Sequence, residues 1–202
     1  MRAFISFSLA ASAALAQYSM DAAGAPPAAA AQVDPAGVRI TGAAGKVWCE
    51  LWLAKALPAG AKSTEDAVSL PTVPHGAFLG IANFPAQAQD RRGNPIKAGV
   101  YAMRYSIFPA DGNHMGAAPQ RDFVILIPVA KDKPPAEMLD YKALMALSAE
   151  ANGMPHPSVL SLAPSSEGKL PALKKEGEHD WTLHLKIGGL PVALIVAGRA
   201  EG

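Results

Sequence analysis

Residues 93–132 read GNPIKAGVYAMRYSIFPADGNHMGAAPQRDFVILIPVAKD, and the expected fold is built outward from this stretch. From residue 100 to residue 107, large apolar side chains alternate with smaller or polar ones, which is the period of a pleated strand with one buried face. Residues 123–129 are nearly all apolar and rich in Val and Ile. A run so short, ending near Pro128 and two charged residues, is typical of a covered strand rather than of a helix.

The same kind of signal extends to both sides of this stretch. In residues 180–187, Trp181 and the apolar residues that alternate with it are expected to point inward, while His184 points outward. One amphipathic helix is expected between the prolines at 134–135 and the Asn-Gly stop at 152–153. Because turns are frequent and βαβ alternation is absent, the pattern predicts a mainly β fold, an antiparallel β-sandwich (jelly-roll or Ig-like) of about eight strands with one α-helix. Further strands are expected at residues 38–41, 46–57, 77–84, 159–162 and 190–197.

The amino-terminal residues 1–16 have the layout of a secretory signal peptide. Arg2 supplies a positive charge, an apolar run follows as far as Leu15, and small residues mark a cleavage site before Gln17. The apolar run is shorter than the roughly 20 residues that a membrane-spanning helix needs. We therefore expect an exported protein, periplasmic or secreted, with no integral membrane segment in the mature chain.

The rest of the chain divides at the end of a low-complexity stretch. Residues 17–36 are rich in Ala and Pro, and they are expected to form a disordered tether outside the fold. Residues 37–202 then form a single domain. Lys and Arg number 18 against 17 Asp and Glu, and the basic residues are scattered. Because nucleic acid requires clustered basic charge, no nucleic-acid partner is expected.

Cys49 is the only cysteine in the chain, so an intramolecular disulfide is excluded. It lies on the apolar face of the alternating strand at residues 46–57, where cysteine normally behaves as a small buried hydrophobic residue. A reactive thiol would need exposure and positively charged neighbours. We expect a buried, unreactive thiol.

Three of the five histidines lie in loops beside Pro or Gly, and they carry a metal-binding hypothesis. These are His75, His114 and His156, and Met115 follows His114 directly. Loops at one end of a sandwich converge, so the three histidines can form one site in which imidazole and thioether suit copper, or imidazole and carboxylate suit zinc. The alternative is that they are separate loop residues. Shared ligation requires the imidazoles to lie within about 5 Å of one another.

Two resemblances accompany these residues. The His114-Met115 pair resembles that of secreted copper chaperones of cupredoxin-like fold, although Leu126 stands where their spacing places a methionine and residues 154–156 run in reversed order. The run IKAGVYAM at residues 96–103 resembles a turn and alternating strand in uncharacterised exported bacterial β-sandwich domain families of unknown function. The second resemblance implies compartment and fold, and it implies no activity.

Trp48 and Trp52 carry a glycan-binding hypothesis. They share one face of the strand at residues 46–57, about 13 Å apart at 3.3 Å per residue. An exposed aromatic face of this kind suits a sugar ring. The alternative is that another layer of the protein covers this face and makes the two tryptophans part of the core.

No catalytic motif is assembled in the sequence. Gly-x-Ser-x-Gly, His-Glu-x-x-His and a phosphate-binding loop after a strand are all absent. Ser166 and Lys169 fit Ser-x-x-Lys, but they lie in a polar loop. His179 and His184 are five residues apart and face opposite sides of their strand, so they cannot act together. We expect a non-catalytic binding or interaction module for a protein, small-molecule or glycan ligand, with copper or zinc binding and glycan binding as alternatives.

Overall fold

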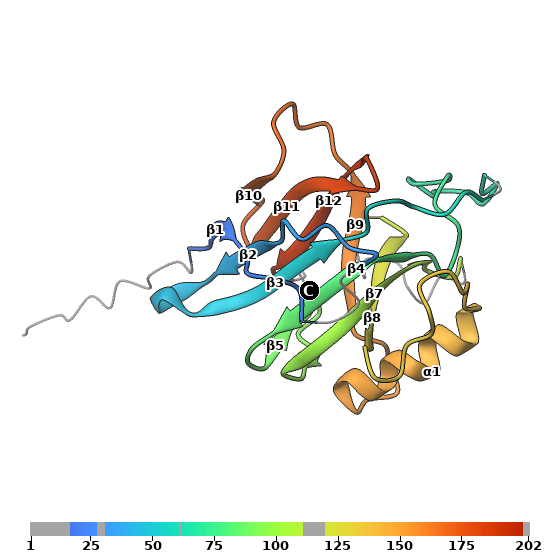
Figure 1. The fold of residues 1–202 in the computed structure, drawn as a ribbon, viewed down its shortest axis with the longest axis horizontal. Coiled ribbons are helices and arrows are strands. Elements are labelled where there is room, and N and C mark those ends of the chain that lie inside the picture. The colour runs from blue at the N-terminus through green and yellow to red at the C-terminus, as the bar shows by residue number, and fades with distance from the viewer. Residues whose placement is uncertain (1–16, 28–30, 61, 111–119, 200–202) are drawn as a thin grey trace, which may run out of the picture.

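The computed structural model describes residues 17–27, 31–60, 62–110 and 120–199. Its fold is mainly β: ten antiparallel strands form one continuous sheet in the order β1-β2-β3-β4-β7-β8-β9-β12-β11-β10 (Figure 1). The sheet rolls until its two edge strands, β1 and β10, lie beside each other. The strands of this sheet are β1 Ser19–Ala22, β2 Val38–Thr41, β3 Val47–Leu53, β4 Phe78–Phe84, β7 Gly99–Ile107, β8 Asp122–Pro128, β9 Val159–Pro164, β10 Ala172–Glu176, β11 Asp180–Ile187 and β12 Leu190–Ala197.

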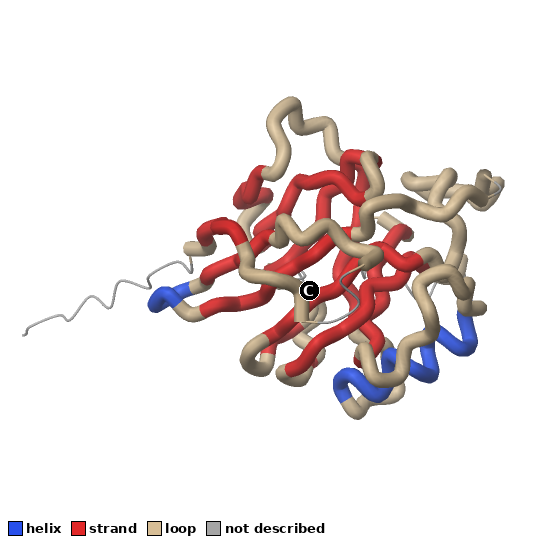
Figure 2. Tube along the Cα trace, in the orientation of Figure 1, coloured by secondary structure: helices blue, strands red, loops and turns tan. Residues whose placement is uncertain are grey.

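Three smaller elements complete the described fold. The strands β5 (Ala88–Gln89) and β6 (Pro95–Ile96) pair as a separate hairpin, and a short 3-10 helix, η1, spans Ala43–Gly45. The helix α1 (Tyr141–Asn152) lies alone against one outer face of the sheet (Figure 2). No helix among the described residues has both the length and the apolar character needed to cross a membrane.

A two-sheet sandwich is not confirmed. Strand β9 pairs with β8 on one side and with β12 on the other, so hydrogen bonding continues from the first half of the chain into the second. The number of strands also differs from the expected eight or so, because β1, β10 and the β5–β6 hairpin were not predicted. Strand β10 carries the charged sequence LKKE, which has no apolar alternation, and β1 lies in the Ala-rich segment.

The strand pair β7–β8 forms as predicted, but β7 is buried on both faces rather than on one. Arg104 and Ser106, from the face expected to be exposed, have no accessible surface. Strand β8 separates two cores: Val124 and Leu126 face the core inside the rolled sheet, while Phe123, Ile125 and Ile127 belong to a second core shared with α1. This double burial explains why β8 is apolar at nearly every position.

Helix α1 begins later than predicted and ends where predicted. Its first turn is capped by Asp140, whose carboxylate accepts a hydrogen bond of 2.8 Å from the amide of Ala143. The prolines at 134–135 lie in the preceding loop. Gly153 ends the helix in the left-handed conformation, with φ of 74°.

The segment predicted to be a tether is part of the fold. Strand β1 pairs with β2 from Ser19 opposite Thr41 to Ala22 opposite Val38. Val33 has no accessible surface and bridges to Ala54. The prediction of a disordered tether is therefore wrong for the described part of residues 17–36, because a few apolar and aromatic side chains suffice to dock it. The predicted signal peptide, residues 1–16, lies outside the described residues.

Candidate functional site

His75 is half-buried in the loop before β4, where it lines a cavity of about 420 Å³. Its Nε2 atom lies 2.8 Å from the hydroxyl of Ser106, and the imidazole also forms a hydrogen bond with the backbone of Leu139. Burial lowers the pKa of His75, and the Leu139 bond partly opposes this shift. Both interactions bind the imidazole to the protein itself, so metal ligation at Nε2 would require the Ser106 bond to break.

His156 is exposed and lines a different cavity, of about 190 Å³. The two cavities are neighbours, since Phe108 and Tyr141 line both. Within the described part of the chain, no group of three or more His, Cys, Asp or Glu side chains is placed to hold a metal ion. His114 and Met115 lie outside the described residues, so the copper or zinc site stays a prediction.

Trp48 and Trp52 do not form an exposed platform. Trp52 is 2% exposed, and its indole N–H donates a 2.8 Å hydrogen bond to the carbonyl of Gly24. Trp48 is half-buried and donates a 2.8 Å bond to the carbonyl of Val196. The ring of Tyr18 packs edge-on against Trp48, at 5.7 Å between centroids. The amino-terminal segment covers this face of β3, which corrects the prediction of a glycan-binding surface.

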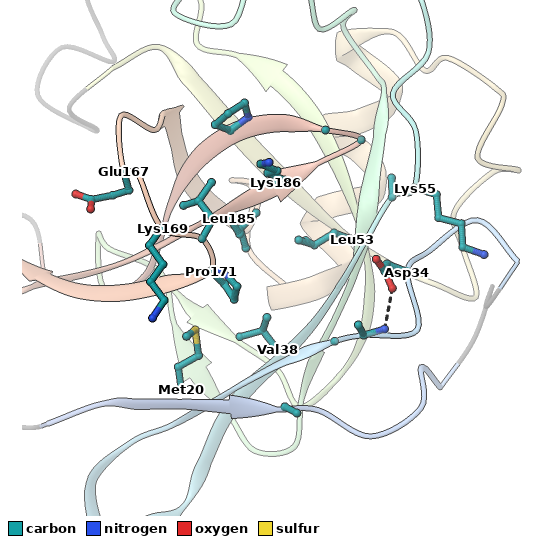
Figure 3. A pocket seen from close by; sticks show the side chains of 18 of the residues that line it. Met20, Asp34, Val38, Leu53, Lys55, Glu167, Lys169, Pro171, Leu185 and Lys186 are labelled. Atoms are coloured by element: carbon teal, nitrogen blue, oxygen red, sulfur yellow. Dashed lines mark hydrogen bonds between the residues drawn. The ribbon is translucent and has the colours of Figure 1, made fainter.

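The rolled sheet leaves a cavity of about 1030 Å³ where its two edges splay apart, and we call this the seam cavity (Figure 3). One wall comes from β1, β2 and the end of β3, and the opposite wall comes from the loop before β10 and the β11–β12 hairpin. Apolar side chains from both walls point into it in Figure 3. These are Met20, Val38, Leu53, Pro171 and Leu185.

Charged side chains surround this apolar floor. Lys55 donates a 3.1 Å hydrogen bond to the carbonyl of Ala31, so its ammonium group is partly satisfied. Lys169 and Lys186 form no ion pair with any residue in the described ranges. In Figure 3 the side chain of Lys169 extends toward Met20 on the opposite wall. Positive charge is therefore available at the mouth of an apolar cavity.

Residues 165–169 of the seam-cavity loop are held by a polar cluster that the sequence did not reveal. The hydroxyl of Ser165 lies 2.9 Å from Nδ1 of His184, and Nε2 of the same imidazole lies 3.1 Å from Oε1 of Glu176. Glu167 pairs with Lys174 at 2.6 Å. The Lys174 hydrogen bond lowers the pKa of Glu167, whose side chain is half-buried.

His184 is 5% exposed, which corrects the expectation that it points into solvent. The β-alternation itself is right, since Leu183 and Leu185 face the core on the other side. What covers His184 is the loop beginning at Ser165, which folds back over the outer face of β11. Ala193 lies opposite His184 in the strand register, and its small side chain leaves space for the imidazole. Only the pairing of β9, β12, β11 and β10 brings these residues together.

The comparisons with known proteins give no match: no family model, no curated protein and no solved structure matches this chain.

Proposed function

We propose that this protein is an exported binding module whose seam cavity takes an elongated apolar molecule with one anionic end, such as a long-chain carboxylate. The observation that carries the proposal is the cavity of about 1030 Å³ with an apolar floor and, at its mouth, Lys169 and Lys186 without an ion pair among the described residues. Protein cavities that enclose small molecules commonly measure about 300–1,000 Å³ and are lined mainly by apolar side chains. The volume of the seam cavity therefore suits a small molecule such as a long-chain carboxylate.

The floor supports an apolar chain. Val38 and Leu185 are 9% and 2% exposed, so they present little surface to water except toward the cavity. Met20 and Leu53 lie on the same wall as Val38, opposite Leu185, and are half-buried. Each methylene group that a ligand removes from water contributes about 0.8 kcal/mol. A chain of several methylenes therefore gains enough to offset the cost of immobilising it.

The charges support a carboxylate at one end of the ligand. Three acidic groups line the cavity: Glu167 already pairs with Lys174, Asp34 accepts a 2.9 Å hydrogen bond from the amide of Ala36, and Asp21 is exposed on β1. Lys169 has no such partner among the described residues. A ligand carboxylate beside Lys169 would supply the missing counter-charge.

The experiment is a titration of the exported protein with dodecanoate and with dodecanol, followed by calorimetry or by displacement of a fluorescent probe. Lys169→Glu should weaken dodecanoate binding by about tenfold, equivalent to about 1.4 kcal/mol, and leave dodecanol binding nearly unchanged. Lys175→Glu is the matched control, since Lys175 is exposed on β10 and does not line the cavity. Absence of dodecanoate binding by the parent protein would contradict the proposal.

The exported location is part of the same proposal and has its own test. Sequencing of the mature protein from the periplasm or culture medium should give Gln17 as the first residue. That residue directly precedes Tyr18, the first side chain that packs on the sheet.

A further inference from the structure

We infer that Ser165, His184 and Glu176 form a hydrolytic site that cleaves carboxylic esters. Ser165 is the nucleophile, His184 is the general base, and Glu176 is a positioning residue. The inference rests on a chain of two hydrogen bonds through the imidazole. The Ser165 hydroxyl lies 2.9 Å from Nδ1 of His184, and Nε2 of His184 lies 3.1 Å from Oε1 of Glu176. A nucleophile within hydrogen-bond reach of a base that a third group orients is the arrangement that activates a serine.

The hydrogen bonds determine which imidazole nitrogen can accept a proton. The Glu176 carboxylate can only accept, so the ring nitrogen that faces it, Nε2, carries the hydrogen. Nδ1 is then unprotonated and accepts the Ser165 hydroxyl hydrogen. The neutral imidazole is thus held in the tautomer that a general base for Ser165 requires.

The surroundings keep this geometry fixed. His184 is 5% exposed, whereas Ser165 is half-buried and so remains open to solvent. The amide of Ser165 donates a 3.2 Å hydrogen bond to the carbonyl of Pro191, which ties the serine backbone to β12. The ion pair between Glu167 and Lys174 ties the loop that follows Ser165 to strand β10. The imidazole is therefore almost fully buried, and Ser165 is the more accessible of the two residues.

The reaction proceeds in two balanced steps. In the first, the Ser165 oxygen bonds to the ester carbonyl carbon, its proton passes to Nδ1 of His184, and the proton then passes to the departing alkoxide as the carbon–oxygen bond breaks. In the second, water gives a proton to His184 and attacks the acyl-serine. The acid leaves, and the proton returns to Ser165. No other reactant is needed beyond the ester and water.

The position of the loop points to esters of long-chain acids. Glu167, two residues after Ser165, lines the seam cavity, together with Gly168 and Lys169. An acyl chain in that cavity would bring its carbonyl end to this loop. This preference for chain length rests on the proposed ligand binding, whereas the reactivity of Ser165 does not.

The first test is labelling of the intact mature protein with a fluorophosphonate, in which Ser165 forms an oxygen–phosphorus bond, fluoride leaves and His184 takes the proton. Peptide mapping should place the label on Ser165. Ser165→Ala should abolish labelling, while Ser166→Ala, an exposed neighbour outside the cluster, should label like the parent. His184→Gln should slow labelling by about 100-fold or more, as expected for loss of a general base.

The second test is turnover of 4-nitrophenyl octanoate and 4-nitrophenyl acetate. The parent should hydrolyse both, with Ser165→Ala inactive, and Glu176→Gln should lower kcat with little change in KM. A merely structural role for Glu176 would change both constants or unfold the protein, which circular dichroism detects. No labelling of Ser165, or unchanged labelling in folded His184→Gln, would overturn the inference. Labelling with no preference for octanoate would instead contradict only the proposed use of the seam cavity.

Discussion

The helix side of the sheet and its seam are closed by different chemistry. On the helix side, Arg104 and Asp132 form an ion pair of 3.1 Å whose side chains are 0% and 7% exposed. At the seam, the amino-terminal segment is held by the ring contacts of Tyr18 and the indole bond of Trp52, and a large cavity remains. A buried ionic network is tolerated only when every member is satisfied, so it fixes one geometry. Closure by aromatic rings and a short strand leaves the seam cavity open.

The strongest test of this comparison is Arg104→Met. The guanidinium of Arg104 donates to Asp132 and to the carbonyls of Gly76, Lys133, Pro134 and Glu137. Its loss leaves a buried carboxylate without a counter-charge, so we expect the free energy of unfolding to fall by about 3–5 kcal/mol. Urea denaturation followed by circular dichroism measures the change.

Arg104→Lys is the matched control for this prediction. It keeps the charge but has three donors on one nitrogen rather than a planar fork, so it cannot reach all the acceptors. It should be less destabilising than Arg104→Met. A loss below about 1 kcal/mol in Arg104→Met would show that the ionic network does not hold the helix side closed.

A smaller effect is expected at the seam, from Gly37→Ala. A Cβ atom at Gly37 would collide with the indole Nε1 of Trp52, so the ring or the segment above it must move. Overpacking of this kind typically costs about 1–3 kcal/mol. Thermal unfolding gives the loss of stability, and a red shift of tryptophan emission reports the displaced segment. Gly24→Ala is the control, because a Cβ there meets nothing within 4 Å, and an equal effect in both variants would refute the explanation.

The smallest expected effect is on the pH dependence of stability. It concerns His75, whose imidazole lies next to the start of α1 on the helix side. Burial lowers the pKa of His75 from its ordinary value of 6.5, so the unfolded chain binds the proton more tightly than the folded protein. The contribution of His75 to stability is therefore complete above about pH 6.5 and is lost as the pH falls below it.

His75→Gln should flatten this pH dependence of the unfolding midpoint between pH 7.5 and pH 5. The exposed His179→Gln serves as the control and should leave the dependence unchanged. The measurement is a series of urea unfolding curves across the range. A parent and a His75→Gln variant with identical pH profiles would contradict the assignment.

Local patterns were enough to predict most strands. Strands β2, β11 and β12 have the predicted bounds, because alternation is a property of adjacent residues. The helix start was wrong because the two prolines fit a first turn as well as they fit a loop. The segment around these prolines forms a loop rather than a helical turn, because Arg104, nearly thirty positions earlier, donates hydrogen bonds to the carbonyls of Lys133 and Pro134. No pattern of adjacent residues carries that information.

The candidate site was harder to predict because it depends on strand order. The sequence indicated that His184 faces away from the core, which is correct for the strand but says nothing of the loop that covers it. Strand β10 was missed because its charged residues lack alternation, and with it the place of Glu176. The tryptophan pair was identified by spacing, yet its cover came from the Ala-rich segment that composition assigned to disorder.

Burial of the single cysteine protects the folded protein from disulfide-linked dimerisation. Cys49 is 1% exposed, and burial raises the pKa of its thiol, so the reactive thiolate is suppressed. Two copies of the protein can therefore become joined by a disulfide only after β3 has left the sheet. Under oxidising conditions, a disulfide-linked dimer would therefore mark molecules that had unfolded.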